Sequence, residues 1–201
     1  MGGRSRVAAQ MLAGKGFSEI INMSGGIKAW KSEKALGKEE LGLELFTGKE
    51  SPEETLVIAY SLEAGLQEFY LTMAPKVQHD ASRKLFEKLS SIEVKHQQRI
   101  YDAYIDLTAA SMNQEEFARE KVIPAMEGGL TTEEYMAIYK PDIEVVEEVI
   151  SLAMAIEAQA LDLYQRAAQR AENAASQAML VQIAGEERSH LEQLGKLFEQ
   201  L

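Results

Sequence analysis

The chain has 201 residues, of which 46% are hydrophobic and 26% are charged, a composition typical of globular proteins that bury a core. It contains no cysteine, which excludes disulfides, iron–sulfur clusters, thiolate metal sites and a thiol nucleophile. A net charge of −11 argues against nucleic acid as a partner, because nucleic acid binds basic surfaces. The sequence shows no membrane span and no signal peptide, so we expect a cytoplasmic protein that does not associate with a membrane.

Charge divides the chain into two parts. Residues 1–36 carry six basic and two acidic residues, whereas residues 37–201 carry fifteen basic and thirty acidic residues. We therefore expect a separate N-terminal segment over 1–36 and a linker over 37–50, where charge and glycine are frequent. The main domain is expected over 51–201.

The N-terminal segment shows the pattern of a small α/β unit. Residues 4–14 predict a short helix that ends at Gly14, and residues 19–23 predict a strand. Gly25 and Gly26 predict a turn, and a second short helix is expected through Trp30. The predicted strand around Ile20 has no partner within the segment, and a symmetry copy could supply one. We therefore expect a homodimer, an assembly that is also common among helical bundles of the kind described below.

This segment is similar to the C-terminal end of a rhodanese (sulfurtransferase) domain. The similarity lies in Gly3-Arg4-Ser5, Ala8-Ala9, Leu12, Gly16-Phe17, Asn22, Gly25-Gly26 and Trp30. In that family a cysteine precedes the Gly-x-Arg-Ser stretch, and this chain has no cysteine to serve there. The resemblance therefore implies a truncated or degenerate remnant without sulfurtransferase activity. The alternative is a longer natural protein that has a complete rhodanese domain.

The main domain begins with a helix signal and continues as four long helices. Ser51 can cap a helix, Pro52 suits its first position, and Glu54 completes a capping box. Further long helices are expected over 80–107, over 142–172, and from Asn173 to the C-terminus. About 33 residues with two short helical stretches separate the second long helix from the third. This order predicts a mainly α fold, a four-helix bundle with one long crossover.

An internal repeat relates the two helix pairs. A shift of 94 residues superimposes the first pair on the second, and the matching positions carry side chains that can bind or support a metal. They are Glu63 and Glu157, Tyr70 and Tyr164, Glu93 and Glu187, and His96 and His190. Such a pattern is expected of a site with internal two-fold symmetry.

The repeated glutamates create an electrostatic problem that metal ions would solve. Glu93 and His96 form a Glu-x-x-His motif, as do Glu187 and His190, and each motif lies on the apolar stripe of its helix. Unpaired carboxylates are costly to bury, and four of them would be neutralised by two divalent cations. The alternative is a plain helical bundle with surface charges.

The positions around these motifs allow further expectations. Glu68, Asp162 and Glu186 lie off the stripes and are expected to be solvated. For Tyr70 and Tyr164, simple core packing is the alternative to a role at the site.

These motifs resemble the ferritin-like superfamily, and residues 51–201 are most similar to the rubrerythrin di-iron domain. The resemblance implies two iron ions, with manganese or zinc as possible substitutes. It implies that Glu63, Glu93 and His96 hold one ion, that Glu157, Glu187 and His190 hold the other, and that Glu93 and Glu187 bridge them. Tyr70 and Tyr164 could hydrogen-bond the ligand carboxylates.

The resemblance implies an oxidoreductase that reduces hydrogen peroxide or dioxygen and has a part in oxidative stress. Its electrons would come from an external donor, a rubredoxin-like protein or a flavoprotein. Typical rubrerythrins carry an additional glutamate where this chain has Ala160, and the equivalent position in the first repeat is Leu66. The alternatives are a ferritin-like protein that binds and oxidises ferrous iron, and a metal-stabilised interaction module without enzymatic activity.

Overall fold

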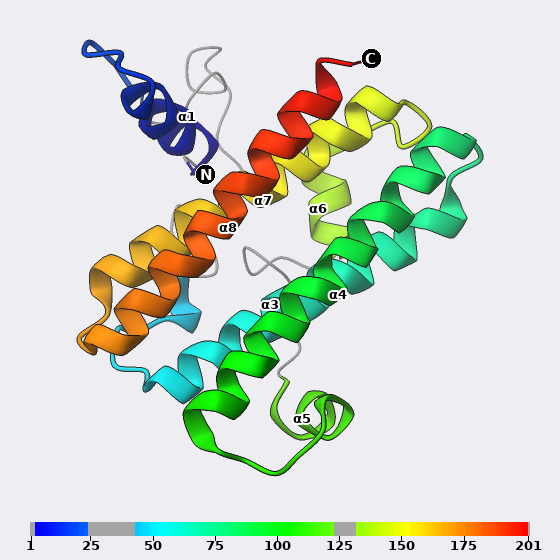
Figure 1. Ribbon diagram of the computed structural model, residues 1–201. Coiled ribbons are helices and arrows are strands. Elements are labelled where there is room, and N and C mark those ends of the chain that lie inside the picture. Colours follow the sequence, from blue (N-terminus) through cyan, green and yellow to red (C-terminus); the bar gives the residue numbers. More distant parts are fainter. Residues whose placement is uncertain (1–2, 24–42, 123–131, 201) are drawn as a thin grey trace.

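The computed structural model describes residues 3–23, 43–122 and 132–200 and is dominated by four long helices (Figure 1). Helix α3 (Pro52–Met73) packs along α4 (Asp80–Thr108), and α7 (Val146–Arg170) packs along α8 (Ala174–Phe198). The two pairs meet through contacts of α3 with α8 and of α4 with α7. The crossover carries α5 (Gln114–Lys121) and α6 (Thr132–Tyr139). The predicted mainly α fold is confirmed.

The first long helix begins as its sequence predicts. The Ser51 hydroxyl accepts a hydrogen bond from the Glu54 N–H at 3.1 Å, and the Glu54 carboxylate accepts one from the Ser51 N–H at 2.8 Å. The apolar residues at helical spacing along α3 are all buried: Leu56, Ala59, Tyr60, Leu62, Leu66, Phe69, Tyr70 and Met73. After α3 comes a short 3-10 turn, η2 (Ala74–Lys76). None of the helices in the described part of the chain has the length and apolar character that a membrane span requires.

The third long helix begins four residues later than predicted, at Val146, because Glu144 is used in a turn. The Glu144 carboxylate accepts hydrogen bonds from the backbone N–H groups of Gln78 at 2.8 Å and His79 at 2.6 Å. These N–H groups lie just before α4, so Glu144 ties the beginning of α4 to the beginning of α7. The fourth helix begins as predicted after Asn173, whose side chain accepts the N–H groups of Ala175 and Ser176.

The Glu144 turn predicts a pH-dependent contribution to stability. The Gln78 N–H, with a smaller effect of the His79 N–H, lowers the pKa of Glu144 from its ordinary value of 4.5. A carboxylate with a lowered folded-state pKa stabilises the fold above its unfolded pKa, and this is lost as the pH falls through the folded value. We expect Glu144→Gln to lower the urea midpoint at neutral pH, and we expect this difference to shrink as the pH falls below 4.5. A difference that persists unchanged in acid would contradict this role.

The N-terminal segment is only partly as expected. The predicted helix is confirmed as α1 (Gly3–Gly14), but residues 17–23 are irregular, and the described part of the chain contains no strand with which they could pair. The predicted strand over 19–23 is therefore wrong, because an extended segment forms a strand only when a ladder partner exists. Strand pairing therefore gives no support to the expected homodimer, which stays a prediction. The predicted Gly25-Gly26 turn and the helix through Trp30 lie outside the described residues.

Helix α1 packs against α7 through a buried ion pair. The Arg6 guanidinium donates to both carboxylate oxygens of Asp162, at 2.7 Å from Nε and 2.6 Å from Nη2, and Val7 is buried beside this pair. Asp162 is only 6% exposed, so the expectation that it is solvated is wrong. A bidentate arginine removes the cost that an unpaired carboxylate would have in this place.

The second half of the predicted linker follows the surface of the bundle. Leu43, in the short 3-10 helix η1 (Leu43–Leu45), and Phe46 are both buried. Gly48 then takes a positive φ of 94°, and a side chain there would collide with the carbonyl of Arg170 at the end of α7. The Gly48 carbonyl accepts the N–H of Glu172 at 2.7 Å. Glycine at this position lets the linker approach the turn between α7 and α8.

Candidate metal centre

The first group of candidate ligands joins α3 to α4. Glu63 comes from α3, while Glu93 and His96 lie one turn apart on α4. His96 Nδ1 is 2.8 Å from the nearer oxygen of Glu93 and 3.3 Å from that of Glu63. All three residues are at least 95% buried, so the sequence places two carboxylates and an imidazole in the core.

The second group repeats this arrangement between α7 and α8. Glu157 comes from α7, and Glu187 and His190 lie one turn apart on α8. His190 Nδ1 is 3.5 Å from an oxygen of each glutamate. Both glutamates are buried, and the His190 side chain is 12% exposed.

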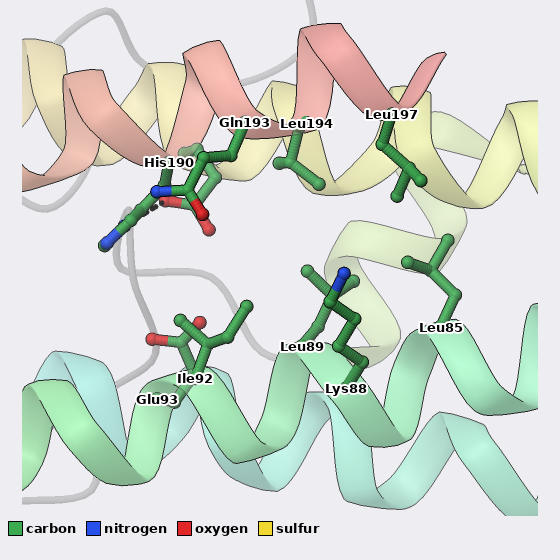
Figure 2. Close-up of a pocket in the computed structure, with 10 residues that line it drawn as sticks. Leu85, Lys88, Leu89, Ile92, Glu93, His190, Gln193, Leu194 and Leu197 are labelled. Atoms are coloured by element: carbon green, nitrogen blue, oxygen red, sulfur yellow. Dashed lines mark ion pairs between the residues drawn. The ribbon is translucent and has the colours of Figure 1, made fainter. Parts of the chain in front are cut away.

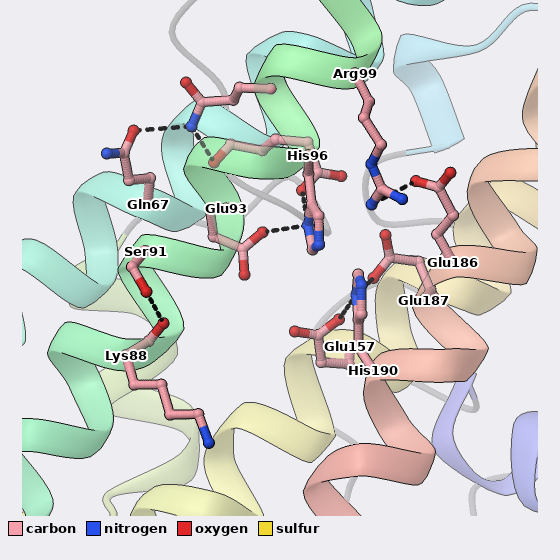
Figure 3. Close-up of polar contacts among 12 residues, drawn as sticks. Gln67, Lys88, Ser91, Glu93, His96, Arg99, Glu157, Glu186, Glu187 and His190 are labelled. Carbon is pink, nitrogen blue, oxygen red and sulfur yellow. Dashed lines mark hydrogen bonds and ion pairs between the residues drawn. The ribbon is translucent and has the colours of Figure 1, made fainter.

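The two groups adjoin across the centre of the bundle (Figure 3). The rings of His96 and His190 stack with their centroids 4.0 Å apart and an angle of 8° between their planes. The structure thus brings together all six residues that the sequence singled out, in two sets related by the internal repeat. Their role as ligands remains a prediction.

The donor atoms fit a pair of hard or borderline cations. In each group, one oxygen or nitrogen of every residue lies within 4.8 Å of those of the others, which is close enough for a shared ion. Carboxylate and imidazole donors suit iron, manganese or zinc. Within the described residues, the buried atoms Glu157 Oε2 and His190 Nδ1 make no hydrogen bond, so each keeps a lone pair or a proton site that an ion could use.

Electrostatics favours the charged form of Glu157 despite its burial. Burial raises the pKa of this carboxyl group, but the facing His190 imidazole and the Glu187 carboxyl group stabilise the carboxylate more strongly. The net effect is a pKa below the ordinary value of 4.5. The Glu157 side chain is therefore a carboxylate at neutral pH, which is the form that binds a cation.

Tyr164 links the two groups. Its hydroxyl donates to Glu63 Oε1 at 3.4 Å, so a tyrosine of the second repeat orients a candidate ligand of the first. Tyr70 is fully buried, and its ring packs against Phe69 and Phe86. The predicted hydrogen bond of a tyrosine to a ligand carboxylate is present for Tyr164, and for Tyr70 it remains a prediction.

A family model described as Rubrerythrin matches residues 54–198, which cover the four long helices except for the first two residues of α3 and include both groups of candidate ligands. The chain belongs to the rubrerythrin family. Members of this family are typically di-iron oxidoreductases, so the family implies an iron site where the carboxylate and histidine clusters lie. No curated protein and no solved structure gives a significant match. The family match does not reach residues 1–36, and the comparisons give no support to a rhodanese-like remnant there.

The two positions at which the chain departs from the rubrerythrin pattern lie in the apolar core. Leu66 and Ala160 are each at most 1% exposed and belong to the apolar core beside the candidate ligands. An apolar side chain offers no donor atom to a metal ion. Within the described residues, the carboxylates grouped with a histidine closely enough to share an ion are those of Glu63, Glu93, Glu157 and Glu187.

One polar residue beside the site was not predicted from the sequence. Gln97 follows His96 on α4, is 7% exposed, and donates to the Gln67 side chain at 2.8 Å and to the Glu63 carbonyl at 3.4 Å. It thus ties α4 to α3 at a candidate ligand. The repeat equivalents of Gln97 and Gln67 are Leu191 and Leu161, so the 94-residue comparison gave no signal for this contact.

A small pocket between α4 and α8 leads to the candidate ligands (Figure 2). Its volume is about 60 Å³, and its inner end is formed by Glu93, Glu157 and His190. The remaining lining is mostly apolar: Leu85, Lys88, Leu89 and Ile92 from α4, and Gln193, Leu194 and Leu197 from α8. The pocket thus has room for a molecule of a few atoms next to the ligand groups.

Proposed function

We propose that this protein is a non-haem di-iron oxidoreductase that reduces hydrogen peroxide or dioxygen with electrons from an external donor. The observation that supports this best is the pair of buried Glu-Glu-His groups, whose histidine rings stack at 4.0 Å within a rubrerythrin-family bundle. The buried carboxylates would be neutralised by two divalent cations, as in other carboxylate-bridged bundles.

Each group would hold one iron ion. Glu63, Glu93 and His96 would form one half of the centre, and the equivalent residues of the second repeat the other, with Glu93 and Glu187 as the bridging carboxylates. Two ferrous ions bound there would supply one electron each, so that hydrogen peroxide and two protons yield two molecules of water. The chain has no cysteine that could hold another redox centre, so re-reduction requires a donor such as a rubredoxin-like protein or a flavoprotein.

The protein's own contribution is to position the ligands and to keep water out. The apolar side chains of both core clusters surround the carboxylates, which strengthens electrostatic interactions inside the site. Tyr164 fixes Glu63 through its hydroxyl, and Gln97 holds the backbone of the same residue. These contacts leave the pocket between α4 and α8 as space for a small oxidant.

Ferritin-like iron handling is the second candidate function. Leu66 and Ala160 favour it, because the additional carboxylate typical of peroxide-reducing rubrerythrins is missing from both repeats. In that case ferrous iron would be the substrate.

Metal analysis combined with an anaerobic peroxide titration tests the proposal. We expect two iron ions per chain, and complete oxidation of the diferrous protein by one equivalent of hydrogen peroxide. Iron uptake well beyond two ions per chain, with a cage-sized assembly, would instead support iron handling. A diferrous protein that reacts with neither peroxide nor dioxygen would contradict both oxidative functions.

A further inference from the structure

The internal repeat gives the metal centre two equivalent ends along α4 and α8, and the side chains at these ends differ. A shift of 94 residues relates Ile92 to Glu186 and Arg99 to Gln193. Ile92 and Gln193 therefore mark one end of the centre, while Arg99 and Glu186 mark the other.

An ion pair spans the helices at the second end. Arg99 Nη2 of α4 lies 3.1 Å from Glu186 Oε2 of α8, and Figure 3 shows this pair beside His96 and Glu187. Glu186, which was expected to be solvated, is half-buried with its side chain 22% exposed. The pair places two long side chains across the space between α4 and α8.

At the first end, no ion pair between described residues joins α4 to α8, and the pocket lies there instead. Figure 2 shows Ile92 and Leu89 of α4 facing Gln193 and Leu194 of α8 across this space. Where the second end has a carboxylate, this end has the half-buried Ile92. The leucine and isoleucine side chains that make up most of this wall admit small neutral molecules and offer no donor atoms to a metal ion, and Gln193 adds a single neutral amide.

Lys88 adds a positive charge to the same end. It is exposed, lines the pocket, and has no ion pair with any residue that the structure describes. Its repeat equivalent is the neutral Gln182. A lysine at the mouth raises the local potential and so opposes the approach of a divalent cation, with no such effect on hydrogen peroxide or dioxygen.

We propose that the pocket between α4 and α8 is the route by which a small uncharged oxidant reaches the centre, and that Ile92 and Lys88 make this route selective against cations. This rests on the proposed oxidoreductase function and adds to it a direction of approach and a class of substrate. At the equivalent end, the Arg99–Glu186 pair lies between α4 and α8 instead.

Xenon tests the route without any metal, because xenon binds small apolar cavities. Crystals of the protein pressurised with xenon are expected to show it between Leu89, Ile92 and Leu194. Xenon confined to the Arg99 end, or absent from the pocket, would overturn the proposal.

Variants in which the residues of one end of the centre replace those of the other end test the route in the iron-loaded protein. Ile92→Glu with Gln193→Arg copies the ion pair of the second end onto the first, and is expected to slow oxidation by hydrogen peroxide by about tenfold at unchanged iron content. Ile92→Phe, which fills the pocket without adding charge, is expected to act in the same direction and to displace xenon. The matched control, Arg99→Gln with Glu186→Ile, is expected not to slow the reaction. If the control slowed the reaction and Ile92→Glu with Gln193→Arg did not, the oxidant would enter at the Arg99 end and the proposal would be wrong.

Metal uptake by the metal-free protein tests the role of Lys88. With Co²⁺ as the probe, followed by its absorption, we expect Lys88→Glu to speed uptake several-fold and Lys88→Gln to have an intermediate effect. The effect should weaken in high salt. Equal uptake rates for all three proteins would overturn the selectivity against cations. Failure of the proposed peroxide reaction would appear in the wild-type titration, whereas the xenon and cobalt measurements judge the pocket independently.

Discussion

Replacing Glu93 or Glu187 by alanine is expected to abolish the binding of two metal ions. Each of these carboxylates is 98–99% buried, and each belongs to one of the two ligand groups. In the proposed centre each of these carboxylates bridges the two ions, so its loss would remove a donor from each half and one of the four negative charges that would hold the ions. The measurement is the metal content of the purified variants after loading with ferrous iron and removal of the excess.

Glu186→Ala is the matched control for this experiment. Glu186 is adjacent to Glu187 on α8, but its carboxylate pairs with Arg99 away from the ligand groups. We expect this variant to keep the metal content of the wild-type protein. Retention of two equivalents by Glu93→Ala or Glu187→Ala would refute the bridging role of that residue.

The second large effect is expected at the contact between α1 and the bundle. Arg6→Ala would leave the carboxylate of Asp162 buried, and among the described residues the cation that remains near it is the more distant Arg166, at 3.9 Å. Removing one partner of a buried pair costs about 3–5 kcal/mol, and we expect about 2 kcal/mol here because the Arg6 side chain is 25% exposed. The free energy of unfolding from urea denaturation measures this loss.

Two further variants separate the charge effect from a general effect on α1. Arg4→Ala removes an exposed arginine of the same helix, which lies over the Tyr139 ring, and is expected to cost less than about 1 kcal/mol. Arg6→Ala combined with Asp162→Asn should recover part of the stability, because no charge then remains buried. A double variant as unstable as the sum of the two single variants would contradict the ion-pair explanation.

The bundle could be predicted from the sequence because its signals are local. The capping box at Ser51 and the cap at Asn173 mark helix starts through contacts over two or three residues, and the structure shows both. The start of α7 was predicted four residues too early because Glu144 bonds to backbone groups 65 and 66 residues away. The strand over 19–23 was wrong for a related reason, since strand formation depends on a partner that a local pattern cannot supply.

The candidate site was predictable for a different reason. Its residues recur at a fixed spacing, so the repeat identified Glu63, Glu157 and the two Glu-x-x-His motifs together. What the repeat could not reveal is where the two halves differ. The contacts of Gln97 and the pocket beside Ile92 lie at positions whose repeat equivalents have other chemistry, and the partner of Asp162 lies 156 residues away, in a helix outside the repeat.

The difference between the two ends of the centre has a consequence for how such a protein can have arisen. If two identical helix pairs assembled as separate chains, the two ends of the centre would carry identical side chains, because every substitution appears on both sides of the symmetry axis. Once duplication and fusion place both halves in one polypeptide, each half can change alone. Arg99 and Glu186 on one side, and Ile92 and Gln193 on the other, are an asymmetry that two identical chains related by a two-fold axis cannot have.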